Sequence, residues 1–232
     1  MKTPGVYIIE KNAFPNSVVE VATAIPAFIG HTQFARDGNK DLTGIPFRIS
    51  SMAEFHSFFG FAPTLRFGIR PEDSESEDTT NDINVLFPDG SCQLTLPKTF
   101  YALYYNMLLF YANGGGPCYI VSIGDYEHDF KSIDFTNALL ALKKEQEPTL
   151  VVVPEAVYME EGDCYKVQTA ALMHCGNDMK NRFAILDVFN GYKDENGAVI
   201  KSFRENIGSN FLAYCASYYP WINTSVSYTH LR

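Results

Sequence analysis

An unbroken apolar run at residues 149–154 constrains the fold more than any other stretch of this 232-residue sequence. The aliphatic residues from Leu150 to Val153 follow one another with no polar residue between them. Such a run is typical of a strand buried on both faces, as found in parallel sheets covered by helices on both sides. Residues 24–30, 118–123 and 182–188 are predicted to be further strands of the same sheet.

Helix-like segments alternate with these strands. A short helix is expected to begin at Ser50 or Ser51, with Glu54 at capping-box spacing from Ser51, and to end at Phe59 before Gly60. Further helices are predicted at 98–113, at 134–146 with Asp134 as the cap, at 163–176 with Gly176 as the stop, and at a short segment capped by Ser202, before a last strand at 211–219. This alternation indicates an α/β fold with a largely parallel sheet flanked by helices.

Two regions depart from the alternation. Residues 33–45 are polar and Gly-rich and are predicted to form a loop. Residues 64–97 contain extended runs at 65–69, 83–87 and 92–96, with a tight turn expected at Asp89-Gly90. We interpret residues 64–97 as a β-hairpin excursion on the surface, in which the acidic stretch at 72–82 is a solvated loop.

The first 22 residues form a predicted extended arm. Pro4-Gly5 precedes the β-branched and aromatic run Val6, Tyr7, Ile8, Ile9 and Glu10. A strand of this kind cannot fold alone, and left unpaired it promotes aggregation. We therefore expect it to pair with its own domain or to add to the sheet of a neighbouring chain.

Composition argues against several classes of partner. The net charge is −9, and the 18 Lys and Arg residues are scattered, whereas binding to nucleic acid or to an anionic membrane needs clustered positive charge. No apolar run approaches the roughly 20 residues of a membrane-spanning helix. The first five residues carry one positive charge and no apolar segment of the signal-peptide type follows.

The cysteine pattern indicates free thiols in a reducing compartment. The five cysteines are odd in number and include no CxxC pair: Cys92, Cys118, Cys164, Cys175 and Cys215. A disulfide framework is therefore not expected. The five histidines and five cysteines do not group as zinc ligands, and the acidic stretch lacks the glycine and spacing of a calcium loop. We predict no metal site and no cofactor site.

No catalytic motif stands out. Gly114 to Gly116 follow a helix and precede a strand, the reverse of a phosphate-binding loop, and are interpreted as a helix stop. His174 and Cys175 are helix neighbours that point about 100° apart. Ser209 is interpreted as a turn serine, and nothing singles out Cys118 or Cys215 as a nucleophile. We therefore predict no catalytic residue.

Two residues at the end of a predicted strand leave an enzymatic function possible. Asp187 and Asn190 follow a predicted strand, at the end where open α/β sheets bind ligands, although a loop role is the favoured interpretation. The triplet Asn223-Thr224-Ser225 has the form of a glycosylation site, which we attribute to chance because no signal peptide precedes it.

The chain resembles the contractile tail sheath proteins of phages, pyocins and related contractile injection systems. Five stretches in the same order carry the resemblance: PGVYIIE at 4–10, VATAIPAFIG at 21–30, SMAEFHSFFG at 51–60, FYANGGGPCYIV at 110–121 and ASYYPW at 216–221. Together they are spread over most of residues 4–222.

This resemblance implies a subtilisin-like α/β core that is used structurally, without a protease triad. It also implies that the arm, through Val6, Tyr7, Ile8, Ile9 and Glu10, pairs with neighbouring subunits in hexameric rings stacked around an inner tube. Contraction would be a rigid-body rearrangement of subunits that drives the tube through a target envelope. The implied partners are other sheath subunits, the tube protein, and baseplate and terminator proteins. The implied location is a virion tail or injection particle assembled in the bacterial cytoplasm.

The chain departs from this family at its C-terminal end. Family members are usually longer and finish with a C-terminal arm, whereas residues 225–232 fit no family strand. We expect the native sequence to end near Asn223 and the chain to be an N-terminal fragment. The expected organisation is an arm at 1–22, the start of the core at 23–63, the hairpin excursion at 64–97, an incomplete α/β core at 98–222 and a non-native tail at 223–232.

Two other functions remain open from the sequence. One is an α/β hydrolase-type enzyme that uses a Cys or Asp at a strand end. The other is a non-contractile scaffold with the same fold. Thiol reactivity separates the enzyme from the sheath, because a catalytic cysteine is hyper-reactive.

Overall fold

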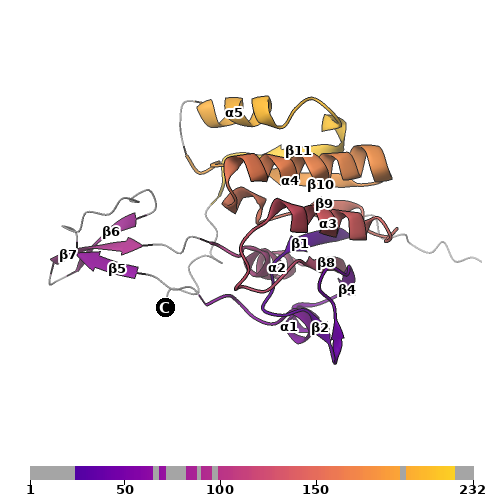
Figure 1. The fold of residues 1–232 in the computed structure, drawn as a ribbon, viewed down its shortest axis with the longest axis horizontal. Coiled ribbons are helices and arrows are strands. Elements are labelled where there is room, and N and C mark those ends of the chain that lie inside the picture. The colour runs from indigo at the N-terminus through magenta and orange to yellow at the C-terminus, as the bar shows by residue number, and fades with distance from the viewer. Residues whose placement is uncertain are drawn as a thin grey trace, which may run out of the picture.

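A six-stranded, mostly parallel sheet organises the chain, and helices flank it (Figure 1). The computed structural model describes residues 24–64, 68–71, 82–87, 90–95, 99–193 and 197–222. The strands lie in the order β11-β10-β9-β1-β8-β4. Their bounds are Pro26–Gly30 for β1, Phe47–Ile49 for β4, Cys118–Ser122 for β8, Leu150–Val152 for β9, Phe183–Asp187 for β10 and Cys215–Tyr218 for β11. All neighbours are parallel except β4 and β8, so the predicted α/β class is confirmed.

The central strand β1 is buried on both faces. It pairs with β8 on one side and with β9 on the other, and all five of its residues are buried. Ala27 and Ile29 belong to one hydrophobic cluster, whereas Phe28 belongs to a second cluster on the opposite face. The apolar stretch at 149–154 is less enclosed than expected, because in β9 Val151 alone is fully buried.

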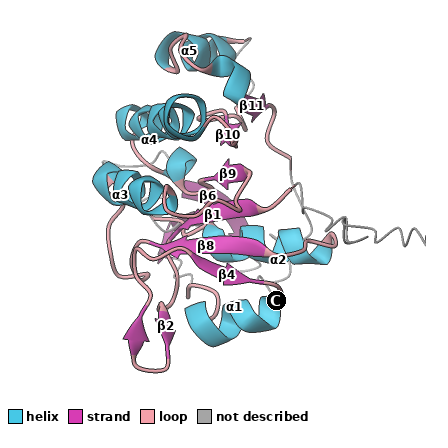
Figure 2. Cartoon of the chain, turned by 90° about the vertical axis from the view of Figure 1, so that its right-hand side faces the viewer, coloured by secondary structure: helices cyan, strands magenta, loops and turns pink. Residues whose placement is uncertain are grey.

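The helices form two layers, one on each face of the sheet (Figure 2). One layer, with most of the first cluster, consists of α3 (Ser132–Leu142), α4 (Glu161–Met173) and α5 (Ala198–Asn206). The other consists of α1 (Met52–Phe59) and α2 (Leu103–Ala112), which pack Phe55, Phe59, Leu103 and Met107 against Phe28 and Ile120. In the described part of the chain, no helix is long and apolar enough to cross a membrane.

The capping prediction for α1 is confirmed. The Ser51 side chain accepts a hydrogen bond from the Glu54 backbone N–H at 3.2 Å. The Glu54 carboxylate reaches back to the N–H of Ser50, at 2.6 Å, rather than to that of Ser51. The helix ends before Gly60, whose φ of 85° suits glycine.

Three helix starts differ from the predictions. The helix expected from residue 98 begins only at Leu103, whose backbone N–H donates to the carboxylate of Glu155. Asp134 is not the cap of α3 but an acidic residue of its first turn. Ser202 does not cap α5, which begins after Gly197; it lies inside the helix and its hydroxyl donates to Glu161.

Gly176 is not a helix stop. After α4 the chain continues as a π-helical segment, His174–Met179. A Cβ on Gly176 would lie 2.5 Å from the Phe211 Cβ, so glycine is needed there for close packing rather than for termination. The last predicted strand is also shorter than expected, because residues Leu212–Tyr214 form a 3-10 turn before β11.

Short strands occupy regions where loops or a hairpin were expected. The predicted loop at 33–45 contains a small hairpin, β2 (Arg36–Asp37) with β3 (Lys40–Asp41), and leads to β4, which was not predicted. The region interpreted as a hairpin excursion holds three antiparallel strands in the order β5-β7-β6: Gly68–Pro71, Gly90–Thr95 and Asp82–Phe87. Figure 1 shows this small sheet to one side of the main sheet.

Several predictions fall on residues that are not described. The arm at 1–22, the turn residue Asp89, the acidic stretch 72–81, the side chain of Cys92 and the tail 223–232 lie outside the described residues.

Candidate functional site

The carboxyl edge of the parallel strands collects the polar residues of the core. In this sheet β8 and β9 follow one another in the chain but lie on opposite sides of β1, so the strand order reverses at β1. Open α/β sheets bind ligands at such a reversal, beyond the carboxyl ends of the strands. His31 and Thr32 follow β1 directly, Ser122 ends β8, and Glu155 comes shortly after β9.

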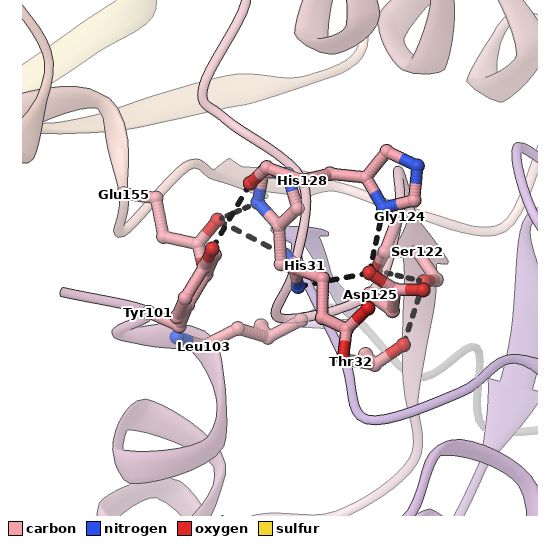
Figure 3. A network of polar contacts seen from close by, with 10 residues as sticks. His31, Thr32, Tyr101, Leu103, Ser122, Gly124, Asp125, His128 and Glu155 are labelled. Atoms are coloured by element: carbon pink, nitrogen blue, oxygen red, sulfur yellow. Dashed lines mark hydrogen bonds and ion pairs between the residues drawn. The ribbon is translucent and has the colours of Figure 1, made fainter. Parts of the chain in front are cut away.

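A buried His–Glu pair lies at the centre of this edge (Figure 3). The His31 Nδ1 atom lies 2.7 Å from the Glu155 Oε2 atom, and the two side chains are 1% and 0% exposed. The backbone N–H of His31 donates to the same oxygen at 3.0 Å, and the N–H of Leu103 donates to Oε1 at 3.3 Å. Glu155 therefore holds together the end of β1 and the start of α2.

Aromatic side chains enclose the pair. The rings of Tyr101, Phe130 and Phe135 lie 5.3, 5.0 and 6.0 Å from the His31 ring, centroid to centroid. Burial raises the pKa of the Glu155 carboxyl, and the hydrogen bond from His31 acts in the opposite direction. A carboxylate and the imidazole that it orients are two of the three members of a catalytic triad, but this imidazole is buried among aromatic rings. The geometry therefore favours a structural role for the His31–Glu155 pair over a catalytic role.

A second set of polar contacts extends from the pair to the surface. Thr32 and Ser122, both buried, share a side-chain hydrogen bond of 2.6 Å, and the Thr32 backbone N–H donates to the carbonyl of Gly124. At the rim, the exposed Asp125 carboxylate lies 2.6 Å from His128 Nδ1. The backbone N–H of Glu127, followed by His128, lowers the pKa of Asp125. Figure 3 shows this row running from Glu155 to His128.

The described cysteines form no disulfide bonds, and their surroundings disfavour the ionised, reactive thiolate. Cys118, Cys164 and Cys175 are buried, and Cys215 is half-buried. Burial raises the pKa of Cys118 to about 11 and the pKa of both Cys164 and Cys175 to about 12, and it also raises the pKa of Cys215. Cys118 and Cys215 begin β8 and β11, so they lie at the amino edge of the sheet, opposite the carboxyl edge. A catalytic thiol needs a lowered pKa instead.

His174 contacts an arginine rather than its neighbour Cys175. Its Nε2 atom lies 2.8 Å from Nη1 of Arg182, a buried side chain that also donates to the backbone carbonyls of Leu142 and Glu145. Burial, with the Arg182 charge second, lowers the pKa of His174 to about 4. Arg182 thus donates to the carbonyl of the last residue of α3, Leu142, and to the carbonyl of Glu145 in the segment that follows.

The other sequence candidates have structural positions. The helix-stop interpretation of Gly114 to Gly116 is confirmed: α2 ends at Ala112, and Gly114 has a φ of 83°. Asn190, with a φ of 55°, accepts a turn hydrogen bond from Lys193. Ser209 is exposed between α5 and the 3-10 turn. Asp187, at the end of β10, is exposed beside a small open hollow that Tyr158 and Trp221 also line.

Sequence reasoning missed His31 and Glu155. Both follow predicted strands directly or after one proline, so the strand-end rule that selected Asp187 could have selected them too. Among the described residues, no group of three or more His, Cys, Asp or Glu side chains is placed to hold a metal ion. No protein-family model and no curated protein matches this chain.

Proposed function

We propose that this protein is a structural subunit of a contractile tail sheath, which polymerises as stacked hexameric rings around an inner tube. The supporting observation is where the resembling segments lie. Residues 21–30 include the central strand β1, 51–60 include α1, 110–121 include the end of α2 and β8, and 216–221 include most of the edge strand β11. The sequence likeness thus coincides with the sheet and its packing.

The chemistry of the carboxyl edge supports the same function. His31 and Glu155 are buried against each other, and the described thiols have raised pKa values. A subtilisin-like core used for assembly requires packing of this kind and no exposed nucleophile. Its work would come from contacts between subunits rather than from a reaction.

The edge strand β11 offers a place for assembly. It pairs with β10 on one side, and within the described residues no strand pairs with its other side. An extended segment can add to such an edge through backbone hydrogen bonds. We propose that an arm such as residues 1–22, with Val6, Tyr7, Ile8 and Ile9 as its apolar positions, makes contacts of this type between subunits.

Deletion of the arm tests the proposal. The protein is expressed from its source gene with and without residues 1–20, and both forms are imaged by negative-stain electron microscopy. Tubes are expected from the intact protein, and a folded core without tubes from the deletion. Lys2→Ala serves as a control, since it leaves the apolar positions of the arm intact. Tubes of normal length from the deletion would contradict the arm mechanism, and an intact protein that forms neither rings nor tubes would contradict the sheath function.

A further inference from the structure

One half of the main sheet is covered by described helices on a single face. The helices of three consecutive crossovers, α3, α4 and α5, lie on one face, whereas α1 and α2 lie on the other. In Figure 2, α1 and α2 lie beside β1, β8 and β4, and no described helix covers β9, β10 and β11 from that side. Strands of parallel sheets are nearly always covered on both faces, so this half of the sheet lacks a covering layer.

The burial of the strands shows the same gap. All five residues of β1 are buried, whereas the residues of β10 alternate between half-buried and buried and end on an exposed aspartate. The register of β9, β10 and β11 places one set of side chains on the uncovered side, and we call this surface the open face. It consists mainly of Leu150, Val152, Phe183, Ile185, Asp187 and Tyr218. Phe183 and Ile185 belong to neither described hydrophobic cluster, and Tyr218 is 60% exposed.

The open face has the dimensions of one helix. Neighbouring strands are about 4.8 Å apart, so β9, β10 and β11 together span about 10 Å, the diameter of a helix with its side chains. The five residues of β10 extend over about 16 Å. On the side towards β1, Asn106 of α2 lines one hollow with Phe28 and another with Asp187, so α2 borders the open face. A further helix can therefore pack beside α2 in the same layer.

Helix α3 exposes an apolar stripe of matching size. Ile133 and Leu140 are 58% and 51% exposed, and their spacing of seven residues places them on one side of the helix. Asn137, between them on the same side, is also exposed. The opposite side of α3 packs against its own sheet through residues such as Phe135. The 11 residues of α3 are about 16 Å long, which equals the length of β10.

The charges of the two surfaces are complementary. The open face ends in Asp187, and none of its six residues, nor of those that line the two hollows along α2, is a lysine or an arginine. Lys131 comes directly before α3 and Lys144 shortly after it, and both are exposed. The acidic residue of α3, Asp134, lies about 100° around the helix from Ile133. A lysine therefore meets the aspartate whichever way α3 lies on the open face.

We propose that α3 of one copy of this chain packs on the open face of a second copy, beside its α2. The contact joins two different surfaces, so it is heterologous and can continue from copy to copy into a ring or a helical array. It would serve an assembly of the kind proposed above. The argument from the two surfaces needs neither a tube nor an arm, so this inference does not rest on the proposed function.

Photo-crosslinking identifies what lies on the open face. Tyr218→p-benzoylphenylalanine replaces an exposed ring of that face in the intact protein, and unlabelled and isotope-labelled copies are mixed before irradiation. Peptide mass spectrometry is expected to find crosslinks from the introduced residue to the α3 peptide, joining an unlabelled to a labelled copy. Phe61→p-benzoylphenylalanine is the matched control, because this ring is also exposed but lies beyond α1, and it is expected to give no crosslink to α3.

Substitutions on the two surfaces test the contact energetically. Leu140→Ser on α3 and Tyr218→Ser on the open face are each expected to weaken self-association about tenfold or more in sedimentation velocity. Ile45→Ser, an exposed apolar residue away from both surfaces, is the control and is expected to associate like the wild type. A mixture of the two weakened variants is expected to form one-to-one pairs, because an intact α3 then meets an intact open face. Far-UV circular dichroism checks that each variant folds.

Several results would overturn the proposal. Crosslinks to residues 1–23 or 223–232 would show that a chain end covers the open face, and crosslinks to another surface of the second copy would show a different contact. No crosslink between copies, or unchanged association of both folded variants, would also contradict it. Tubes of the intact protein without the α3 crosslink would contradict this contact and leave the sheath function standing. The α3 crosslink in a protein that forms no tubes would support the contact and contradict the sheath function.

Discussion

The Nδ1 atom of His31 lies 2.7 Å from the Oε2 atom of Glu155, although the two residues are 124 positions apart in the chain. The contact joins the residue after β1 to the segment after β9, and Glu155 also accepts from the first residue of α2. One carboxylate therefore fixes the end of the central strand against two other elements. Because both side chains are buried, the contact cannot be replaced by water when one partner is removed.

Glu155→Ala is expected to lower the free energy of unfolding by about 3–5 kcal/mol, since it leaves a buried imidazole and two backbone N–H groups without their acceptor. Urea denaturation at neutral pH measures the change. Arg48→Ala is the control, because it breaks an ion pair with Glu147 whose side chains are 46% and 41% exposed, and it should cost less than about 1 kcal/mol. Similar losses of unfolding free energy in the two variants would show that the buried pair stabilises the fold no more than an exposed ion pair does.

Gly30→Ala is expected to destabilise the protein by about 1–3 kcal/mol. An added Cβ would lie 3.0 Å from the Glu155 carboxylate, which three contacts hold in place. Gly162→Ala in α4 is the control, since its Cβ would meet no atom within 4 Å, and it should stabilise the helix slightly. Thermal or urea unfolding of both variants measures the difference, and a neutral Gly30→Ala would mean that the Glu155 side chain can move aside.

His174 is expected to make the protein less stable in acid. Its pKa is about 4 in the folded protein against about 6.5 in the unfolded chain, so between these values the unfolded state binds the additional proton. The free energy of unfolding should therefore fall by roughly 3 kcal/mol from pH 6.5 to pH 4 through this residue. Urea denaturation across this range is compared with His174→Gln, which offers Arg182 an acceptor that does not titrate, and with the exposed His128→Gln. An unchanged slope in His174→Gln would contradict the assignment.

The described thiols are expected to react slowly with a maleimide in the native protein, and Cys215 is expected to react before Cys118, Cys164 and Cys175. Cys215 is half-buried, whereas the other three are buried with pKa values raised to about 11 or 12. Timed labelling followed by peptide mass spectrometry measures the order, with labelling in urea as the reference. A single hyper-reactive buried cysteine would favour the enzyme alternative.

Ser51→Ala is expected to cost about 1 kcal/mol, because it removes the side-chain acceptor for the Glu54 N–H at the start of α1. Ser57→Ala is the matched control within the same helix, where the hydroxyl donates to the Ala53 carbonyl and satisfies no free N–H group. Urea denaturation compares the two. Equal losses would indicate that the cap contributes no more than an ordinary surface serine.

The sequence alone determined the elements whose signals are local. The apolar runs that became β1, β8, β9 and β10, and the Ser51–Glu54 cap of α1, depend on side chains close together in the chain, so their periodicity and spacing were readable. The α/β class followed from the order of these elements. The position of Asp187 at the end of β10 was also predictable, because a strand end is visible in sequence.

Only the tertiary structure decided the features that join distant residues. The backbone N–H of Leu103, at the start of α2, donates to the carboxylate of Glu155. The Arg182 side chain donates to the carbonyl of Leu142 at the end of α3. The Phe211 side chain leaves no room for a Cβ on Gly176. None of these partners can be paired from a pattern in one sequence, since each contact spans a stretch of chain that could fold in many ways. The pairing of His31 with Glu155 exists because the sheet places β9 beside β1, and burial in that position gives the contact its strength.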